Sequence, residues 1–154
     1  MNELTTEEIK LLEANKIIPE GTPQAQIKFF IEVCKRKKLD PFLKQIHMVE
    51  RKEDKDGIWK KTYTIQASLD GMRAISQRNG RIMSVKRGVK KIENELYGWC
   101  EITTKDGGIY YDEVPFSEYE QQTNKGVTTI FWRKFPQTMI KKVAEESVRR
   151  MADP

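Results

Sequence analysis

The sequence has few of the residues from which many catalytic sites and metal sites are built. Its 154 residues include one histidine and two cysteines, and the cysteines have no CxxC spacing. A lone histidine excludes a metal cluster or a paired nucleophile built from several imidazoles. Separate cysteines indicate buried free thiols in a reducing compartment, not a disulfide framework. His47 alternates with apolar neighbours and is interpreted as an ordinary strand residue.

Other absences narrow the class of protein. No apolar run approaches the roughly 18 residues that a membrane span needs, and the acidic amino terminus lacks an apolar signal core, so we expect a cytoplasmic location. The sequence has no GxxxxGK[ST] loop and no GxGxxG segment. ATP is therefore not an expected cofactor. The carboxylates form no catalytic signature, so we expect neither an enzyme nor a metal site.

The apolar pattern predicts one α+β domain over residues 1–154, with helices flanking a mostly antiparallel sheet. Helices are expected over about 5–16, 22–38 and 69–79, and from Pro136 onward. Strands are expected over about 45–51, 59–67, 82–92, 96–104 and 109–114. The first two should form a hairpin around a polar turn at 53–57, and 121–126 should be a polar loop.

Local signals predict where several helices begin and end. Thr5 and Glu8 have capping-box spacing at the first helix. Thr22 is the expected N-cap of the second, with Pro23 at its first helical position. Gly80 should close the third helix.

Charge is unevenly distributed along the chain. The net charge of +5 favours an acidic partner, with nucleic acid first and a membrane surface second. Residues 71–92 contain no Asp or Glu among seven cations: Arg73, Arg78, Arg81, Lys86, Arg87, Lys90 and Lys91. Such clusters bind phosphates through counterion release. The alternative is an ordinary solvated surface.

Aromatic and basic residues alternate in the segment 131–135, Phe-Trp-Arg-Lys-Phe. Proteins that bind single strands need cations for the backbone and aromatic faces for the bases. Trp132, Arg133 and Lys134 are therefore candidate DNA contacts. The alternative is that the aromatic rings pack the last helix onto the core.

Two helices present further basic candidates. Helical phase places Arg73 and Gln77 together on the outer side of the helix at 69–79. The last helix carries Lys141, Lys142, Arg149 and Arg150. Its glutamates also form i, i+4 pairs such as Glu145 with Arg149, so a self-neutralising surface is an equal alternative there.

Four motifs occur in an order that resembles a known family. They are Leu-Asp-Pro-Phe-Leu-Lys-Gln-Ile at 39–46 after Phe-x-x-x-Cys-Lys at 30–35, Asp-Gly-Met-Arg at 70–73 with Asn-Gly at 79–80, Trp-x-x-x-Pro-x-x-Met at 132–139, and Arg-Met-Ala at 150–152. Together they resemble the phage RecT/Bet (Red beta-like) family of single-strand annealing recombinases. The resemblance spans about residues 5–154.

The resemblance implies annealing of complementary strands without ATP, in the cytoplasm of a bacterial host, by an oligomeric ring or filament on DNA. Magnesium could assist by screening phosphates. It implies partnership with a phage exonuclease, and it places Lys44 and Arg150 at positions of DNA-contacting cations. Some relatives carry lysine at the position of Val143. Relatives continue past Pro154 into a region linked to partner binding, so this region is expected to be absent and binding of host single-strand-binding protein stays open.

Residue patterns and resemblance together predict a DNA-binding set with no catalytic member. It comprises Lys44, Arg73, Gln77, Arg78, Arg81, Lys86, Arg87, Trp132, Arg133, Lys134, Lys141, Lys142, Arg149 and Arg150. Two other functions remain as alternatives. A metal-dependent nuclease or nuclease subunit would need carboxylates converging in the fold. A sequence-specific regulator would need a recognition helix with side chains that read base edges.

Overall fold

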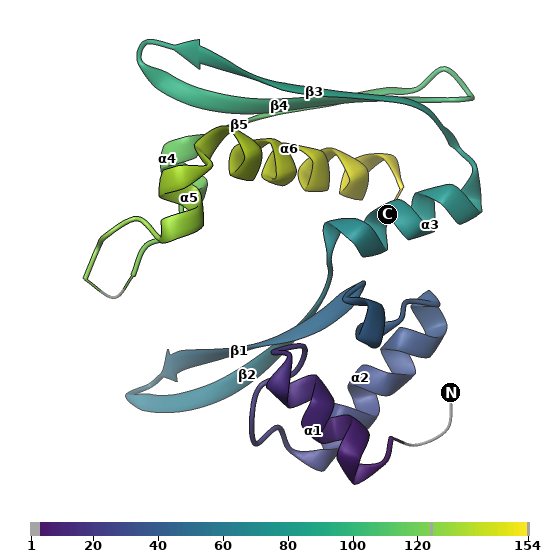
Figure 1. Cartoon of the computed structure of the whole chain (residues 1–154), viewed down its shortest axis with the longest axis vertical. Coiled ribbons are helices and arrows are strands. Elements are labelled where there is room, and N and C mark those ends of the chain that lie inside the picture. Colours follow the sequence, from purple (N-terminus) through teal and green to yellow (C-terminus); the bar gives the residue numbers. More distant parts are fainter. Residues whose placement is uncertain (1–3, 124, 154) are drawn as a thin grey trace. The chain divides into compact units, whose positions relative to one another are not determined.

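The computed structural model of the chain describes residues 4–123 and 125–153. They form two compact units, Met1–Ala74 and Ile75–Pro154, and the boundary falls inside the helix α3 (Leu69–Asn79). Each unit combines helices with an antiparallel sheet (Figure 1). The predicted α+β class is confirmed, with two separate sheets where one was expected. The organisation as a single domain stays a prediction.

The amino-terminal unit contains two helices, a short 3-10 helix and a hairpin. In chain order these are α1 (Thr6–Ala14), α2 (Gln24–Lys37), η1 (Pro41–Leu43), β1 (Ile46–Lys55) and β2 (Ile58–Ala67), followed by the first residues of α3. The i, i+3, i+4, i+7 spacing in α2 predicted one buried face, and Ile27, Phe30, Ile31 and Cys34 are buried there. Apolar periodicity therefore positioned this helix correctly.

The ends of the first two helices test the predicted caps. At α1, Glu8 N donates to Thr5 Oγ1 and Thr5 N donates to Glu8 Oε1, both at 3.1 Å, so the capping box is confirmed. At α2 the cap prediction is wrong by one residue. Pro23 is the N-cap, and the Thr22 hydroxyl donates to the Pro19 carbonyl. That bond to the preceding connector keeps the hydroxyl from capping the helix.

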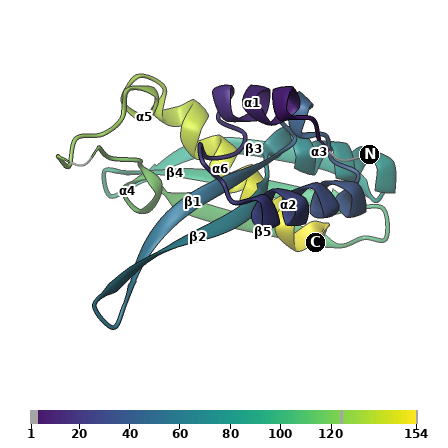
Figure 2. The same cartoon turned by 90° about the horizontal axis from the view of Figure 1, so that it is seen from below.

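The β1–β2 hairpin is longer than the sequence predicted. Its strands pair from Ile46 opposite Ala67 to Lys55 opposite Ile58, so only Asp56 and Gly57 form the turn. Both turn residues have positive φ, 55° and 80°, as a tight hairpin turn with the twist of its strands requires. The hairpin reaches well beyond α1 and α2 (Figure 2). Polar residues at 53–55 therefore extend the ladder instead of forming a loop.

The carboxy-terminal unit is a three-stranded antiparallel sheet covered on one face by a long helix (Figure 1). After the rest of α3 come β3 (Ile82–Ile92), β4 (Glu95–Thr104), β5 (Ile109–Pro115), α4 (Phe116–Tyr119), α5 (Ile130–Lys134) and α6 (Pro136–Ala152). Alternate residues of β4, including Cys100 and Ile102, are buried in a core shared with Ile140, Ala144 and Val148 of α6. The helix thus lies on the face that period-two alternation makes apolar.

Three short helices, η1, α4 and α5, were not predicted, because three to five residues carry no readable periodicity. Other boundaries agree with the sequence. Gly80, at φ 64°, follows α3, and Pro136 opens α6. The predicted loop 121–126 is present except for Asn124, which lies outside the described residues.

The histidine and both cysteines occupy structural positions. His47 lies half-buried in β1, as expected for an ordinary strand residue, and burial lowers its pKa. Both cysteines are free and buried, as predicted. Burial raises the pKa of the Cys34 thiol to about 12 and that of Cys100 to about 11. Both thiols are therefore protonated at neutral pH. Within residues 4–123 and 125–153, no helix is long and apolar enough to cross a membrane.

Candidate nucleic-acid interface

Two sequence motifs meet directly in the amino-terminal unit. The Ser68 amide donates to the Gln45 carbonyl at 2.9 Å, and the Ser68 hydroxyl donates to the Lys44 carbonyl at 2.7 Å. The same hydroxyl oxygen accepts from the Gly71 amide at 3.1 Å. These bonds join the segment 39–46 to the start of α3, which carries Asp-Gly-Met-Arg. We call this contact the motif junction.

Gly71 makes the motif junction possible. A Cβ atom at this position would lie 2.0 Å from the Gln45 carbonyl oxygen, far inside van der Waals contact. Only glycine lets the α3 backbone approach the preceding segment this closely. The glycine of the Asp-Gly-Met-Arg motif therefore has a packing role.

Lys44 projects from a rigid base at this junction. Its backbone has left-handed φ and ψ of 58° and 29°, its amide donates to the Pro41 carbonyl at 3.0 Å, and its own carbonyl accepts from Ser68. The side chain is exposed. A cation on such a fixed backbone can meet a phosphate with little loss of main-chain entropy. Arg73, predicted on an outer face, is half-buried, whereas Gln77 is exposed.

A buried ionic cluster lies in the carboxy-terminal unit. Glu145 is 2% exposed, and its carboxylate lies 3.3 Å from Arg87 Nη1 and 2.7 Å from Arg149 Nε. Arg149 is also buried and donates to the Ser76 hydroxyl at 2.9 Å. The predicted Glu145–Arg149 pair exists, but its placement on the surface is wrong because the cluster lies between α6, α3 and β3. Arg149 is thus held by two protein partners.

Cations at 81–90 in the acid-free stretch meet acids from elsewhere in the carboxy-terminal unit. Arg81 pairs with Asp153 at 3.7 Å, Arg87 with Glu145, and the Lys90 ammonium bonds Glu113. Lys86 lies directly opposite Glu101 in the β3–β4 register. Tertiary pairing therefore neutralises much of the charge that looked unbalanced along the sequence.

A second acid-free stretch keeps its cations at the surface. Residues 121–144 contain no Asp or Glu and five cations: Lys125, Arg133, Lys134, Lys141 and Lys142. Four are exposed and Lys141 is half-buried. The sequence interpretation missed this stretch, although a count of acids between Glu120 and Glu145 would have found it. This part of the unit combines unbalanced positive charge with exposure.

The three aromatic rings of the segment 131–135 differ in exposure. Trp132 is 3% exposed and packs edge-on against Phe116, with ring centroids 5.5 Å apart. Its ring is therefore not available as a stacking face, and the packing alternative describes it correctly. Phe131 and Phe135 are 64% and 53% exposed. The exposed aromatics are thus the two that the predicted set left out.

Comparison with models of protein families gives a match over nearly the whole chain. The sequence model of the RecT family matches residues 2–154. The chain belongs to the RecT family. Comparison with curated proteins found no match. Membership makes this a single-strand annealing protein of DNA recombination, of the RecT/Bet type that the motifs had indicated.

The fourteen predicted residues of this RecT-family chain differ in accessibility. Ten are exposed: Lys44, Gln77, Arg78, Arg81, Lys86, Arg87, Arg133, Lys134, Lys142 and Arg150. Arg73 and Lys141 are half-buried, and Trp132 and Arg149 are buried. The exposed Arg150 pairs with the half-buried Glu146 at 3.7 Å. A pair this long with an exposed partner contributes little, so Arg150 can exchange Glu146 for a phosphate at low cost.

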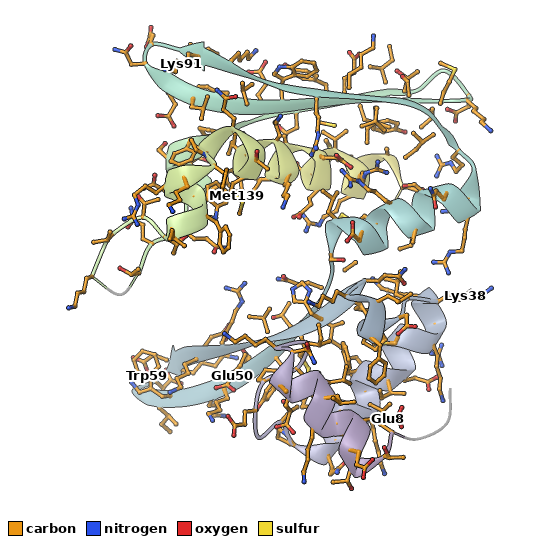
Figure 3. The ribbon with its side chains drawn as sticks, viewed as in Figure 1. Glu8, Lys38, Glu50, Trp59, Lys91 and Met139 are labelled. Atoms are coloured by element: carbon orange, nitrogen blue, oxygen red, sulfur yellow. The ribbon has the colours of Figure 1, made fainter. Side chains whose placement is uncertain are left out.

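The hairpin, which the sequence interpretation treated as a polar tip, has a hollow lined by three lysines and a tryptophan. Trp59 is 69% exposed near the end of the hairpin (Figure 3). With Lys52, Lys60 and Lys61 it lines an open hollow of about 490 Å³. Lys52 and Lys61 are direct cross-strand partners. Like charges in that position repel, and the Glu50 carboxylate, 3.6 Å from the Lys61 ammonium, offsets part of this repulsion.

Proposed function

We propose that this RecT-family protein binds single-stranded DNA and anneals complementary strands without ATP, as an oligomer. The family match over residues 2–154 is the observation that carries the proposal. Exposed cations support it, above all Lys44 at the motif junction and the second acid-free stretch. No observation on the described residues favours the metal-dependent nuclease.

The proposed mechanism uses charge and base pairing only. Lysine and arginine side chains displace counterions from phosphates and reduce the repulsion between two strands. Contacts to phosphates carry no sequence information, so the protein need not read bases. Complementary strands then test their register by pairing, and the free energy of pairing drives the reaction. A magnesium ion would contribute only by further screening.

Assembly follows from the size of the chain. One chain of 154 residues is too small to hold two long strands in register, so several copies should act side by side on DNA. The resemblance supports a ring or filament. It also supports a phage exonuclease as the partner that produces single strands. These parts of the proposal rest on the family and on the size of the chain.

Annealing should proceed without nucleotide. When the full chain meets two complementary labelled strands in nucleotide-free buffer, energy transfer should rise well above the protein-free rate, and ATP should leave that rate unchanged. Light scattering from the same samples should grow when the second strand is added, because duplex formation adds phosphates. A requirement for hydrolysable nucleotide would contradict the proposal. Magnesium-dependent cleavage of the labelled strands would favour the nuclease.

Affinity for single strands should fall steeply with salt and vary little with sequence. Lys44→Ala and Arg150→Ala should each weaken binding several-fold and lower the slope of log K against log salt by about 0.7 per lost phosphate contact. Both side chains are exposed, so the melting temperature should barely change.

Lys105→Ala provides the matched control. This exposed lysine follows β4, outside the predicted set, and its removal should leave the slope unchanged. Equal losses in all three variants would show that net charge alone determines affinity. A large drop in melting temperature for Lys44→Ala or Arg150→Ala would instead assign that residue to a structural ion pair.

A further inference from the structure

Two large apolar rings are held at the surface one helical turn apart. Phe131 and Phe135 are 64% and 53% exposed, and the Phe135 amide donates to the Phe131 carbonyl at 2.8 Å. Trp132 lies between them in sequence and is buried in the core against Phe116. Successive helical residues differ by about 100° in direction. Anchoring Trp132 inward therefore directs Phe131, its neighbour in α5, away from the same core, and Phe135 follows at the C-cap, where φ of −128° and ψ of 57° end the helix.

The surroundings of these rings are basic. Arg133 and Lys134 are exposed between them, and both belong to the acid-free stretch 121–144. Paired aromatic faces and unbalanced cations are what a single strand requires, because bases stack on rings while cations follow the backbone.

A second copy of this chain would fit this aromatic and basic patch less well than a nucleic acid would. In a ring or filament this patch would meet a different surface of another copy, which itself carries a net charge of +5, and in a two-fold contact the patch meets itself. The two sets of Arg133 and Lys134 would then face each other with no acidic residue from this stretch to compensate. Like charges in such a contact oppose association. Charge complementarity thus favours a polyanion.

We propose that Phe131 and Phe135 are stacking faces for bases of the bound single strand, with Arg133 and Lys134 contacting the adjacent phosphates. The inference rests on the proposed function and adds a role for bases to a mechanism otherwise built on phosphates. Stacked bases are held apart and unpaired, ready to test a complementary strand. Because every base has a π-face, this contact is tolerant of sequence.

The test compares oligothymidylate with an abasic strand of the same length, using the full chain. The unchanged protein should bind oligothymidylate more tightly. Phe131→Ala/Phe135→Ala should lose roughly ten-fold or more in affinity for oligothymidylate. Its affinity for the abasic strand and its salt slope should stay unchanged, because its cations remain. The preference for bases should therefore disappear.

Two further double variants separate aromatic stacking from general apolarity. Phe131→Tyr/Phe135→Tyr should keep the preference for bases, since tyrosine offers a similar ring. Phe131→Leu/Phe135→Leu should lose it, although leucine is also large and apolar. Phe29→Ala provides the matched control, because Phe29 is 61% exposed on α2 and lies in the other unit. That variant should bind both strands like the unchanged protein.

Three results would overturn the inference. If the alanine double variant still preferred oligothymidylate over the abasic strand, the two rings would not contact bases. If this variant, or the leucine variant, changed only the native mass without DNA, the patch would be a contact between copies. If the unchanged chain bound neither strand, the proposed function itself would fail, and this inference with it.

Discussion

Glu145→Ala is expected to lower the free energy of unfolding by roughly 3 to 5 kcal/mol. Glu145 is 2% exposed and is bonded to Arg87 and Arg149, so its removal leaves a buried guanidinium without its counter-charge. Urea unfolding followed by tryptophan fluorescence measures the loss. Trp132 is buried in the same unit and reports its unfolding.

The control for this variant lies one residue away. Glu146 is half-buried and pairs at 3.7 Å with the exposed Arg150, so Glu146→Ala leaves no buried charge unpaired and should cost about 1 kcal/mol or less. Similar losses in both variants would show that the cluster around Glu145 contributes no more than a surface pair. Replacing Glu145 and Arg149 together by apolar residues should cost less than losing Glu145 alone, since no buried charge is left unpaired and Arg87, which loses Glu145 in both variants, is exposed.

Gly71→Ala should destabilise the amino-terminal unit by roughly 3 kcal/mol, even though alanine is the better helix former. The new methyl group would lie 2.0 Å from the Gln45 carbonyl oxygen, so α3 must move away from the segment 39–46. That movement strains the hydrogen bonds of Ser68 to Lys44 and Gln45. Circular dichroism during urea unfolding measures the stability, and the affinity for single strands should fall with it because Lys44 is displaced.

Gln77→Ala is the matched change in the same helix. Gln77 is exposed, so its replacement should alter stability by less than about 0.5 kcal/mol. If Gly71→Ala were as stable as this control, the motif junction could not be closely packed. If Gly71→Ala lost stability but kept full DNA affinity, Lys44 would not depend on the junction for its position.

Local rules accounted for much of the fold. The capping box at Thr5, the stop at Gly80 and the start of α6 at Pro136 depend on neighbouring residues alone, and each occurs where expected. Short elements did not follow such rules. In α5, packing against Phe116 determined that Trp132 turns inward and Phe131 outward. The sequence had placed the aromatic part of the candidate site at Trp132, the one ring of the segment 131–135 that is buried.

The charge that a segment presents also depends on residues that are distant in the sequence. The stretch 71–92 is acid-free in sequence, yet Arg87 meets Glu145 and Lys90 meets Glu113 once the strands and α6 come together. The stretch 121–144 has no acidic residue of its own and keeps its cations exposed or half-buried. Counting charges along a chain indicates a partner of opposite sign, but it cannot locate the contact.

By itself the sequence determined the α+β class, most element boundaries and membership in a family of annealing proteins, because these follow from periodicity, caps, turns and ordered motifs. Only the tertiary structure decided which basic and aromatic side chains are available to DNA. Availability depends on partners distant in the chain, as with Arg149 beside Ser76 and Trp132 beside Phe116. Contacts between distant segments determine whether a charge is paired or a ring is buried. A local sequence pattern therefore cannot predict them.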